Sequence, residues 1–446
     1  MLRTVFVSVL LVFAAIAAAC DSDDSAAEPD RPARAAAPAA APPVPAGSES
    51  GAEVTRAGLN EHLRALQRAG DENGGNRSAG SPGDRASADY VSARLREAGW
   101  QVTRQPVRFP YFRLRSAAVR VGGRSLPRGQ GFRVITYSAA GAATGRLRSV
   151  GDGCRRAAFR ALRPGEIPLA ERGRCFFRVK ARNAERAGAR ALVVVDPESR
   201  RGVPETTLGG PGIEIPVVIV GAAAAARPDA HAAVRVDAVS QRRTTENVIA
   251  ETPGGSPEEV VMAGGHLDSV AAGPGLNDNG SGVAALLELA EAVGPRPPGA
   301  RVRLAFWGAE ELGLIGSRRY VRSLDAAERK RIAAYLNFDM VGSPNAVSAV
   351  YTGGDPALER ALRRAAGIPL EDEDIGANSD HAPFEAAGIP IGGLYTGAAE
   401  EGPGGRPRDP CYHRRCDTLR NVDRAVLLRM ARAAAEAVES VSRSER

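Results

Sequence analysis

Five side chains of metal-binding type stand at the ends of apolar, strand-like segments or in the loops between them. They are His266 after "VVMAGG", Asp278 in "GLNDNGSG", Glu311 in "AFWGAEE", Asp339 in "YLNFDM" and His413 in "DPCYHRRCDT". Zn²⁺ accepts imidazole and carboxylate ligands, so we expect His266 and Asp339 to bind one ion. Glu311 and His413 would bind a second ion, and Asp278 would bridge the two. Ions about 3.5 to 4 Å apart can hold a water between them and polarise a carbonyl, so the set predicts a hydrolase.

Three residues beside these ligands have the types that peptide hydrolysis needs. Glu310 precedes a ligand without being needed as one, so we expect it to take the proton from the bridging water and pass it to the leaving amine. Asp268, two residues after His266, is predicted to orient that imidazole. Tyr412, next to His413, is predicted to donate a hydrogen bond to the oxyanion. Each residue alone is weak evidence, and the joint pattern carries the prediction.

The chain has three other histidines. We expect His62 and His231 to be surface residues. His381, in "NSDHAPF", stands between an acidic residue and an apolar turn, so it is either structural or borders the pocket.

The candidate site residues need a sheet that brings strand ends together. From Asn247 onward, strand-like and helix-like segments alternate, which predicts a mostly parallel mixed α/β sheet sandwiched by helices. Functional sites in such sheets lie beyond the carboxyl ends of the strands. Apolar spacing predicts two helices before this region, at 55–69 and 82–98, and the intervening region of about 110–240 is typical of a separate small α/β or β-rich domain.

The first 20 residues, "MLRTVFVSVLLVFAAIAAAC", combine an early arginine, a short apolar run and small residues before Cys20. This pattern resembles a bacterial lipoprotein signal peptide, which predicts an exported protein held at the membrane by a lipid on Cys20. An ordinary cleaved signal is the alternative. Residues 21–52 are rich in Ala and Pro and are predicted to form a disordered tether.

Cysteines and charge limit the remaining classes. Besides Cys20, the four cysteines form two close pairs, Cys154 with Cys175 and Cys411 with Cys416, which an oxidising compartment would let close as disulfides. The net charge of +7 comes from scattered arginines with no nucleic-acid-binding signature, so we expect no nucleic-acid partner.

The segments "GGHLDSV", "LNDNGSG", "FWGAEELGLIGS", "NFDMVG", "SDHAPF" and "CYHRRCDT" follow one another in this order. With them the chain resembles the zinc aminopeptidases of peptidase family M28, of the Streptomyces and vacuolar types. The resemblance implies a zinc exopeptidase fold, two zinc ions on the five ligands named above, Glu310 as the base, Tyr412 as the oxyanion donor and Asp268 as the orienting acid. The middle region resembles a protease-associated (PA) domain, which implies peptidase segments at 53–109 and 241–446 and an inserted domain at 110–240.

Together these observations predict a monomeric, lipid-anchored or secreted metallo-aminopeptidase that releases residues from peptide N-termini. A carboxypeptidase or glutaminyl-cyclase-like activity on the same scaffold is one alternative. A catalytically dead, receptor-like peptidase domain is another.

Overall fold

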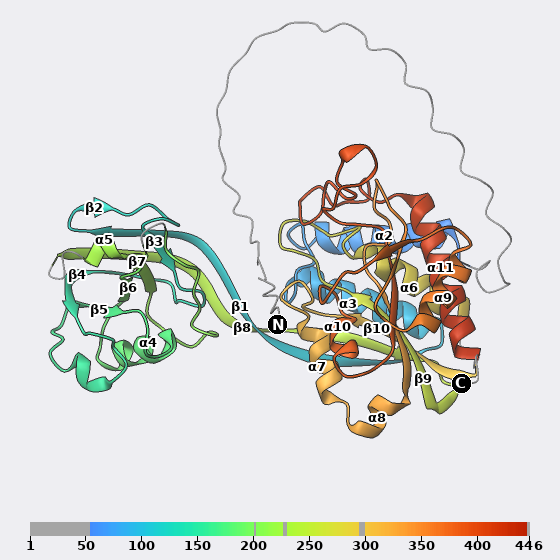
Figure 1. Ribbon diagram of the computed structural model, residues 1–446, viewed down its shortest axis with the longest axis horizontal. Helices are drawn as coiled ribbons and strands as arrows, with labels where there is room; N and C mark the ends of the chain where they lie inside the picture. The colour runs from blue at the N-terminus through green and yellow to red at the C-terminus, as the bar shows by residue number, and fades with distance from the viewer. Residues whose placement is uncertain (1–53, 200–201, 226–229, 294–298, 444–446) are drawn as a thin grey trace, which may run out of the picture. The chain divides into compact units, whose positions relative to one another are not determined.

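The computed structural model describes residues 54–199, 202–225, 230–293 and 299–443 (Figure 1). The predicted signal peptide, its Cys20 and the predicted tether lie outside the described residues. Within these ranges, no helix is both long and apolar enough to cross a membrane.

Two helices open the described chain, α2 (Arg56–Asp71) and α3 (Pro82–Glu97), close to the predicted ranges. The Thr55 side chain caps α2, and the Ser81 side chain, with a proline next to it, caps α3. The prediction that His62 is a surface residue is wrong, because the side chain is 0 % exposed. His62 follows Leu59 by three residues, so helical periodicity places both on the buried face of α2. His231 is exposed, as predicted.

The main sheet is built around four parallel strands, as the alternating pattern predicted. From one edge inward, the strand order is β13 (Glu371–Glu373), β12 (Ala349–Tyr351), β14 (Ile391–Tyr395), β11 (Ile332–Phe338), β9 (Ser256–His266), β10 (Ala300–Trp307) and β8 (His231–Glu251). The parallel strands are β14, β11, β9 and β10, whereas β8 runs antiparallel to β10. The sheet is therefore mixed, with antiparallel strands flanking a parallel centre.

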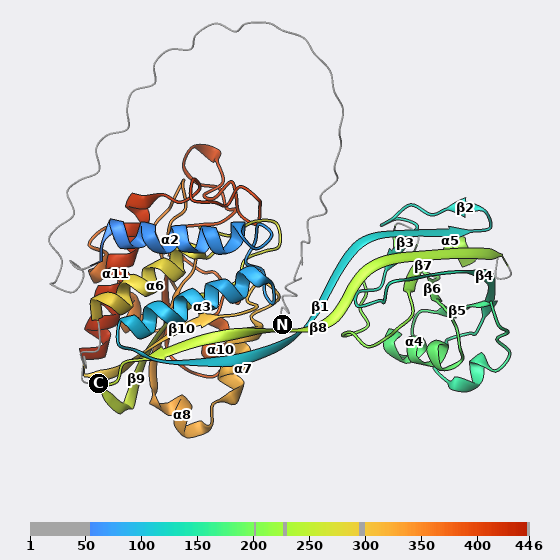
Figure 2. The same ribbon diagram turned by 180° about the vertical axis from the view of Figure 1, so that it is seen from behind.

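Helices cover both faces of this sheet (Figures 1 and 2). One core joins the sheet to α2, α3, α6 (Gly280–Val293), α9 (Pro356–Ala366) and α11 (Arg424–Arg443). The opposite core joins it to α7 (Ile315–Ser323) and α10 (Ala382–Glu385), with α8 (Ala326–Arg331) leading into β11. Strand β9 shows why both faces need cover, because Val261 and Ala263 enter the first core while Val260 and Met262 enter the second.

A long two-stranded ribbon of β1 (Gln101–Val121) and β8 connects the main sheet to a second group of strands. The two strands pair antiparallel from Gln101 with Glu251 to Val121 with Ala232. Strands of this length were not expected from the sequence, and the predicted domain limits near 110 and 240 lie inside the ribbon, where Pro110 pairs with Arg242.

The second group of strands forms a smaller α/β unit. Its strand order is β4 (Gly141–Ser149), β5 (Ile167–Glu171), β6 (Leu192–Asp196), β7 (Val217–Gly221) and β3 (Phe132–Val134), beside the short β2 (Arg124–Ser125), α4 (Phe177–Arg186) and α5 (Ala222–Ala225). Strands β4 to β7 are parallel. The predicted disulfide Cys154–Cys175 is present here, and Cys411–Cys416 is present in the main part.

Candidate active site

His266 and Asp339 lie at the carboxyl ends of two adjacent parallel strands. His266 ends β9 and Asp339 directly follows β11, so the sheet register sets their separation. The His266 Nε2 atom is 3.2 Å from Asp339 Oδ1. The glycines before His266 are required by close packing, because a Cβ on Gly264 would lie 2.7 Å from the Tyr335 hydroxyl and one on Gly265 would lie 2.6 Å from the Phe338 carbonyl oxygen.

Asp278 lies between the two histidines, in the loop that leads into α6. Its Oδ1 atom is 3.1 Å from His266 Nε2, and its Oδ2 atom is 3.2 Å from His413 Nε2. The residue is 6 % exposed. Burial alone would raise the pKa of Asp278, but the hydrogen bonds from the two imidazoles lower it below its usual range. The carboxylate thus lies between the two histidines, where a bridging ligand would have to be.

Glu311 and His413, which both lie on loops, form the other half of the cluster. His413 Nε2 is 3.1 Å from Glu311 Oε2. His413 lies on the loop closed by the Cys411–Cys416 disulfide, has a positive φ of 58° and leaves 42 % of its side chain exposed. The structure therefore brings all five predicted ligands together.

The geometry of this cluster fits divalent metal ions. A tetrahedral zinc ion with bonds of about 2.0 to 2.1 Å holds neighbouring ligand atoms about 3.3 Å apart. Each histidine nitrogen here lies 3.1 to 3.2 Å from two carboxylate oxygens, one of them from Asp278. The Glu311 Oε1 atom is buried without a hydrogen bond, and burial together with the Asp278 charge raises the pKa of Glu311 to about 7. A cation would relieve both features.

Glu310 lies beside the cluster rather than within it. Its Oε2 atom is 4.0 Å from His266 Nε2, and the residue is 9 % exposed. Burial and then the neighbouring carboxylates raise the pKa of Glu310 well above its ordinary value, although the nearby His266 opposes the shift. A raised pKa suits a group that must accept a proton and later release it.

The structure gives Asp268 a different contact from the one predicted. His266 Nδ1 lies 3.0 Å from the backbone carbonyl oxygen of Asp268, whereas the nearer carboxylate oxygen is 4.0 Å away. That carboxylate oxygen instead accepts a hydrogen bond of 3.0 Å from the Glu310 backbone N–H. Asp268 therefore orients His266 through its main chain and Glu310 through its side chain.

Tyr412 lies against one of the two clustered histidines. The Tyr412 ring stacks on the His413 ring with centroids 3.9 Å apart. Burial together with nearby carboxylates raises the pKa of the Tyr412 hydroxyl, which keeps that group protonated.

His381 is 3 % exposed, and its Nε2 atom lies 2.7 Å from the Gly376 carbonyl oxygen. These contacts favour the structural alternative for His381.

Comparison with known proteins identifies the chain's family. The model of peptidase family M28 matches residues 247–438, and the PA domain model matches residues 139–227. An aminopeptidase of Pseudomonas aeruginosa is 38 % identical in an alignment that covers 82 % of this chain and 77 % of the relative. The chain belongs to peptidase family M28.

Further relatives of this M28 chain are also named as aminopeptidases, and one of known structure is a zinc enzyme. A probable lipoprotein aminopeptidase of Mycobacterium tuberculosis, LpqL, is 38 % identical over 84 % of this chain and 82 % of its own length. The structure of BSAP, a zinc aminopeptidase from Bacillus subtilis, superposes with a TM-score of 0.58 at 28 % identity and covers 87 % of this chain and 95 % of that one. The M28 chain is accordingly a zinc-dependent hydrolase with a PA domain.

Sequence reasoning missed Arg77, which braces the loop after His266 in this M28 enzyme. Arg77 is fully buried and donates hydrogen bonds to the backbone carbonyls of Leu267, Pro274 and Gly275. Its own backbone N–H donates to the Ser269 hydroxyl at 3.0 Å. It lies in the Gly-rich loop between α2 and α3, about 190 residues before its partners, so no local sequence signal indicated it.

Two other supporting residues adjoin motifs that the sequence analysis did single out. Asp417, directly after Cys416, accepts hydrogen bonds of 2.8 and 3.0 Å from the backbone N–H groups of Asn277 and Asp278. The Ser379 hydroxyl, in "SDHAPF", donates to Asp339 Oδ2 at 2.7 Å. The motifs "CDT" and "SDH" could therefore have indicated both residues.

Proposed function

We propose that this M28 enzyme is an extracytoplasmic aminopeptidase that hydrolyses the N-terminal peptide bond of peptides at a site holding two zinc ions. The observation that carries the proposal is Asp278, whose two carboxylate oxygens each face a different histidine. His266 and Asp339 complete one set of ligands. Glu311 and His413 complete the other. When bound, the two zinc ions supply Lewis acidity and lower the pKa of a water.

Glu310 is the general base in this proposal. Its raised pKa lets the carboxylate accept the proton of the attacking water and return it to the amine that leaves. The hydrogen bond from the Glu310 backbone to the Asp268 carboxylate fixes where that base sits, which makes Asp268 a positioning residue.

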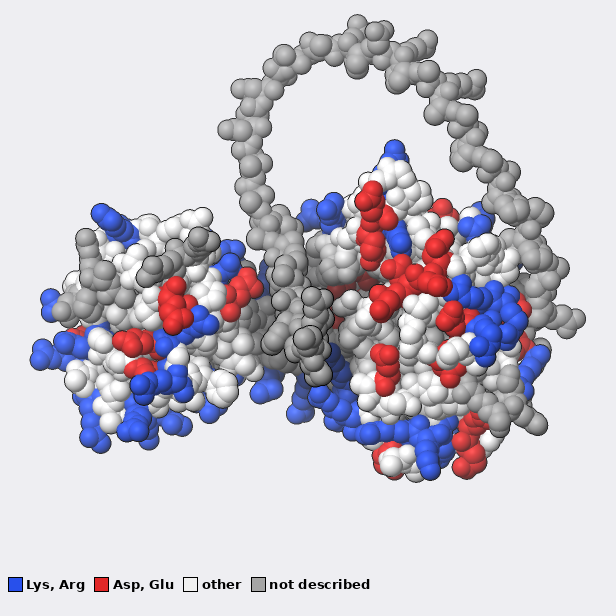
Figure 3. All heavy atoms as spheres, in the orientation of Figure 1, with Lys and Arg blue, Asp and Glu red and all other residues white. Residues whose placement is uncertain are grey.

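Tyr412 stabilises the negative charge that develops on the carbonyl oxygen of the scissile bond. Its hydroxyl stays protonated because burial raises its pKa, so it can donate a hydrogen bond. On the face of the peptidase part seen in Figure 3, Asp and Glu side chains gather near the middle, with Lys and Arg side chains toward the margins.

The peptidase domain is discontinuous in this proposal, with segments at 53–109 and 241–446 separated by the PA domain at 110–240. The shared core supports it, because Leu59 of α2 and Leu95 of α3 pack with Val261 and Leu304 of the main sheet.

The enzyme is exported and held at the outer side of the membrane by a lipid on Cys20. The signal-like N-terminus, the two disulfides and the relative named as a lipoprotein aminopeptidase support this location. A Cys20→Ala variant should leave the membrane fraction with its specific activity unchanged. Retention of that variant at the membrane would contradict lipidation.

The catalytic proposal is tested with Glu310→Gln. The amide cannot accept a proton, so turnover of an aminoacyl chromogenic substrate should fall by roughly 10² to 10⁴, the usual contribution of a general base. Zinc content, measured by elemental analysis, should equal that of the wild type. Loss of zinc in this variant would overturn the assignment of Glu310 as base.

Peptide substrates distinguish the alternatives in the same experiment. Wild-type enzyme should hydrolyse peptides with a free N-terminus and leave N-acetylated copies of the same peptides intact. Release of C-terminal residues, cyclisation of N-terminal glutamine, or no turnover by zinc-loaded protein would each contradict the proposal.

A further inference from the structure

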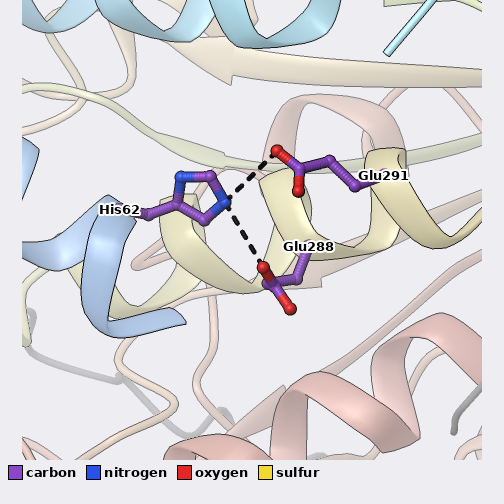
Figure 4. Close-up of side chains that lie close together, drawn as sticks. All are labelled: His62, Glu288 and Glu291. Carbon is purple, nitrogen blue, oxygen red and sulfur yellow. Dashed lines mark ion pairs between the residues drawn. The ribbon is translucent and has the colours of Figure 1, made fainter. Parts of the chain in front are cut away.

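A second cluster of metal-binding side chains lies away from the active site, between α2 and α6. His62 on α2 faces Glu288 and Glu291 on α6 (Figure 4). His62 Nε2 is 3.5 Å from Glu288 Oε1 and 3.7 Å from Glu291 Oε1. His62 and Glu288 are 0 % and 4 % exposed, whereas the Glu291 side chain is 35 % exposed and reaches the cluster from the solvent side.

The His62 ring presents an unpartnered nitrogen to the two carboxylates. Its Nδ1 atom is 2.8 Å from the Tyr90 hydroxyl of α3, a contact that orients the ring. Its Nε2 atom is buried without a hydrogen bond from any described part of the chain. The distances of 3.5 and 3.7 Å are too long for an N–H···O hydrogen bond. They are close to the separation of about 3.3 Å between neighbouring ligand atoms around tetrahedral zinc.

Groups outside the cluster hold each carboxylate in place. The Thr55 backbone N–H donates to Glu288 Oε2 at 2.7 Å, which leaves Glu288 Oε1 directed at His62. Arg94 of α3 donates to Glu291 Oε1 at 2.6 Å. Metal-binding histidines and carboxylates are usually held by such outer hydrogen bonds.

Gly58 provides the space that the Glu288 carboxylate occupies. A Cβ at this position would lie 1.7 Å from Glu288 Oε1. Glycine inside a helix costs roughly 0.5 to 1 kcal/mol relative to alanine, so the third residue of α2 is poorly chosen for the helix alone. The carboxylate that faces His62 explains it.

We propose that His62, Glu288 and Glu291 form a third metal site that binds a transition-metal ion of the Zn²⁺ class. An imidazole with two carboxylates suits Zn²⁺ better than Ca²⁺, which prefers oxygen ligands alone. The bound ion links α2 to α6, the helix that begins two residues after the bridging Asp278. The site is thus structural and separate from the chemistry of Glu310.

The experiment compares zinc content at saturation between wild type and Glu291→Gln by equilibrium dialysis and elemental analysis. Glu291 is 35 % exposed, so its replacement should leave the fold intact, and circular dichroism checks this. We expect the variant to bind one zinc ion fewer per chain than wild type. The difference is read directly, so the result does not depend on how many ions the active site holds.

The matched control is Glu61→Gln on α2. Glu61 also lies near Arg94, at 3.7 Å, but is not part of the cluster. The control should bind as much zinc as wild type.

Gly58→Ala should reproduce the loss seen with Glu291→Gln, because its Cβ displaces the Glu288 carboxylate. Tyr90→Phe should weaken binding about tenfold through the freed His62 ring.

Crystals of the zinc-loaded full-length enzyme give the decisive view. Anomalous density at the zinc edge is expected between His62 Nε2 and the two glutamates. Equal zinc content in wild type and Glu291→Gln, or no anomalous density at this position, would overturn the proposal.

Discussion

The two halves of the candidate active site differ in how their histidines are held. His266 ends a central strand and is 1 % exposed, and its partner Asp339 follows the next strand of the same parallel sheet. His413 lies on a short disulfide-closed loop with 42 % of its side chain exposed. The first half takes its geometry from the sheet register, whereas the second depends on a local cross-link and on backbone strain.

Backbone strain is present in both halves of the site, but the surroundings that enforce it differ. Non-glycine residues with positive φ include Ala309, which precedes Glu310, Met340, which follows Asp339, and His413 itself. Such conformations persist only where the surroundings enforce them. Ala309 and Met340 are buried, whereas His413 is partly exposed, so the His413 half should be the easier one to loosen.

Asp278→Asn should have the largest effect, because the two carboxylate oxygens of Asp278 face different histidines and so connect the two halves. The Asn side chain offers only one oxygen as a metal ligand, and a weaker one, so it cannot bridge two ions as a carboxylate does. We expect turnover to fall by at least about 10³-fold, corresponding to several kcal/mol of transition-state stabilisation. On the two-zinc proposal, both ions should bind more weakly, which a chelator competition measures. Loss of one ion with normal affinity for the other would show that the halves are independent.

Arg77→Met tests the support of the sheet-held half. The change leaves three buried carbonyls without their donor, which should lower the free energy of unfolding by about 3 kcal/mol. Urea unfolding of the metal-free protein measures it. Arg85→Met, on the exposed side of α3, is the control and should leave that free energy almost unchanged. Equal stability of Arg77→Met and wild type would show that the loop after His266 does not need this clamp.

The sequence predicted most helices and strands of the peptidase part, because the patterns that indicate them are local. The caps and apolar spacing of α3 gave its range to within a residue, and the continuous apolar run of β9 reflects burial on both faces. The five candidate ligands that the structure brings together could be selected in the same way, since each follows an apolar strand or lies in a Gly-rich or Cys-bounded loop; their binding of metal stays a prediction. A local sequence pattern is therefore enough to predict a residue's place where that place depends on its own segment alone.

Long-range contacts could not be predicted in this way. The burial of His62 depends on α6, more than 200 residues later, and Arg77 contacts a loop about 190 residues away. The β1–β8 ribbon carries many arginines, so its alternation of buried and exposed residues gave no clear strand signal. The carboxylate of Asp268 contacts the Glu310 backbone because the fold places that residue there, which proximity to His266 in the sequence did not reveal.

Replacement of both Cys411 and Cys416 by serine tests the loop-held half. The bridge spans few residues, so it removes little entropy from the unfolded chain, and the melting temperature of the metal-free protein should change little. Zinc affinity and turnover should fall about tenfold, because His413 and Tyr412 would sample several positions. The matched control replaces Cys154 and Cys175, whose bridge spans 21 residues, and should leave zinc affinity unchanged. Unchanged zinc affinity in the first variant would show that the loop needs no cross-link.

The smallest expected effect is a pH dependence of the unfolding free energy of the metal-free protein, caused by His413. Burial alone would lower its pKa, but hydrogen bonds to Asp278 and Glu311 raise the pKa of His413 from 6.5 to about 10. A pKa raised in the folded state means that the contribution to stability is complete below pH 6.5 and is lost as the pH rises toward 10. Because the side chain is 42 % exposed, solvent screening should reduce this contribution to roughly 1 kcal/mol. Urea unfolding of chelator-treated wild type at pH 6, 8 and 10 should therefore show a steeper loss of stability than His413→Asn. Parallel pH profiles for the two proteins would mean that the exposed half of the site gains nothing from this ion pair before metal binds.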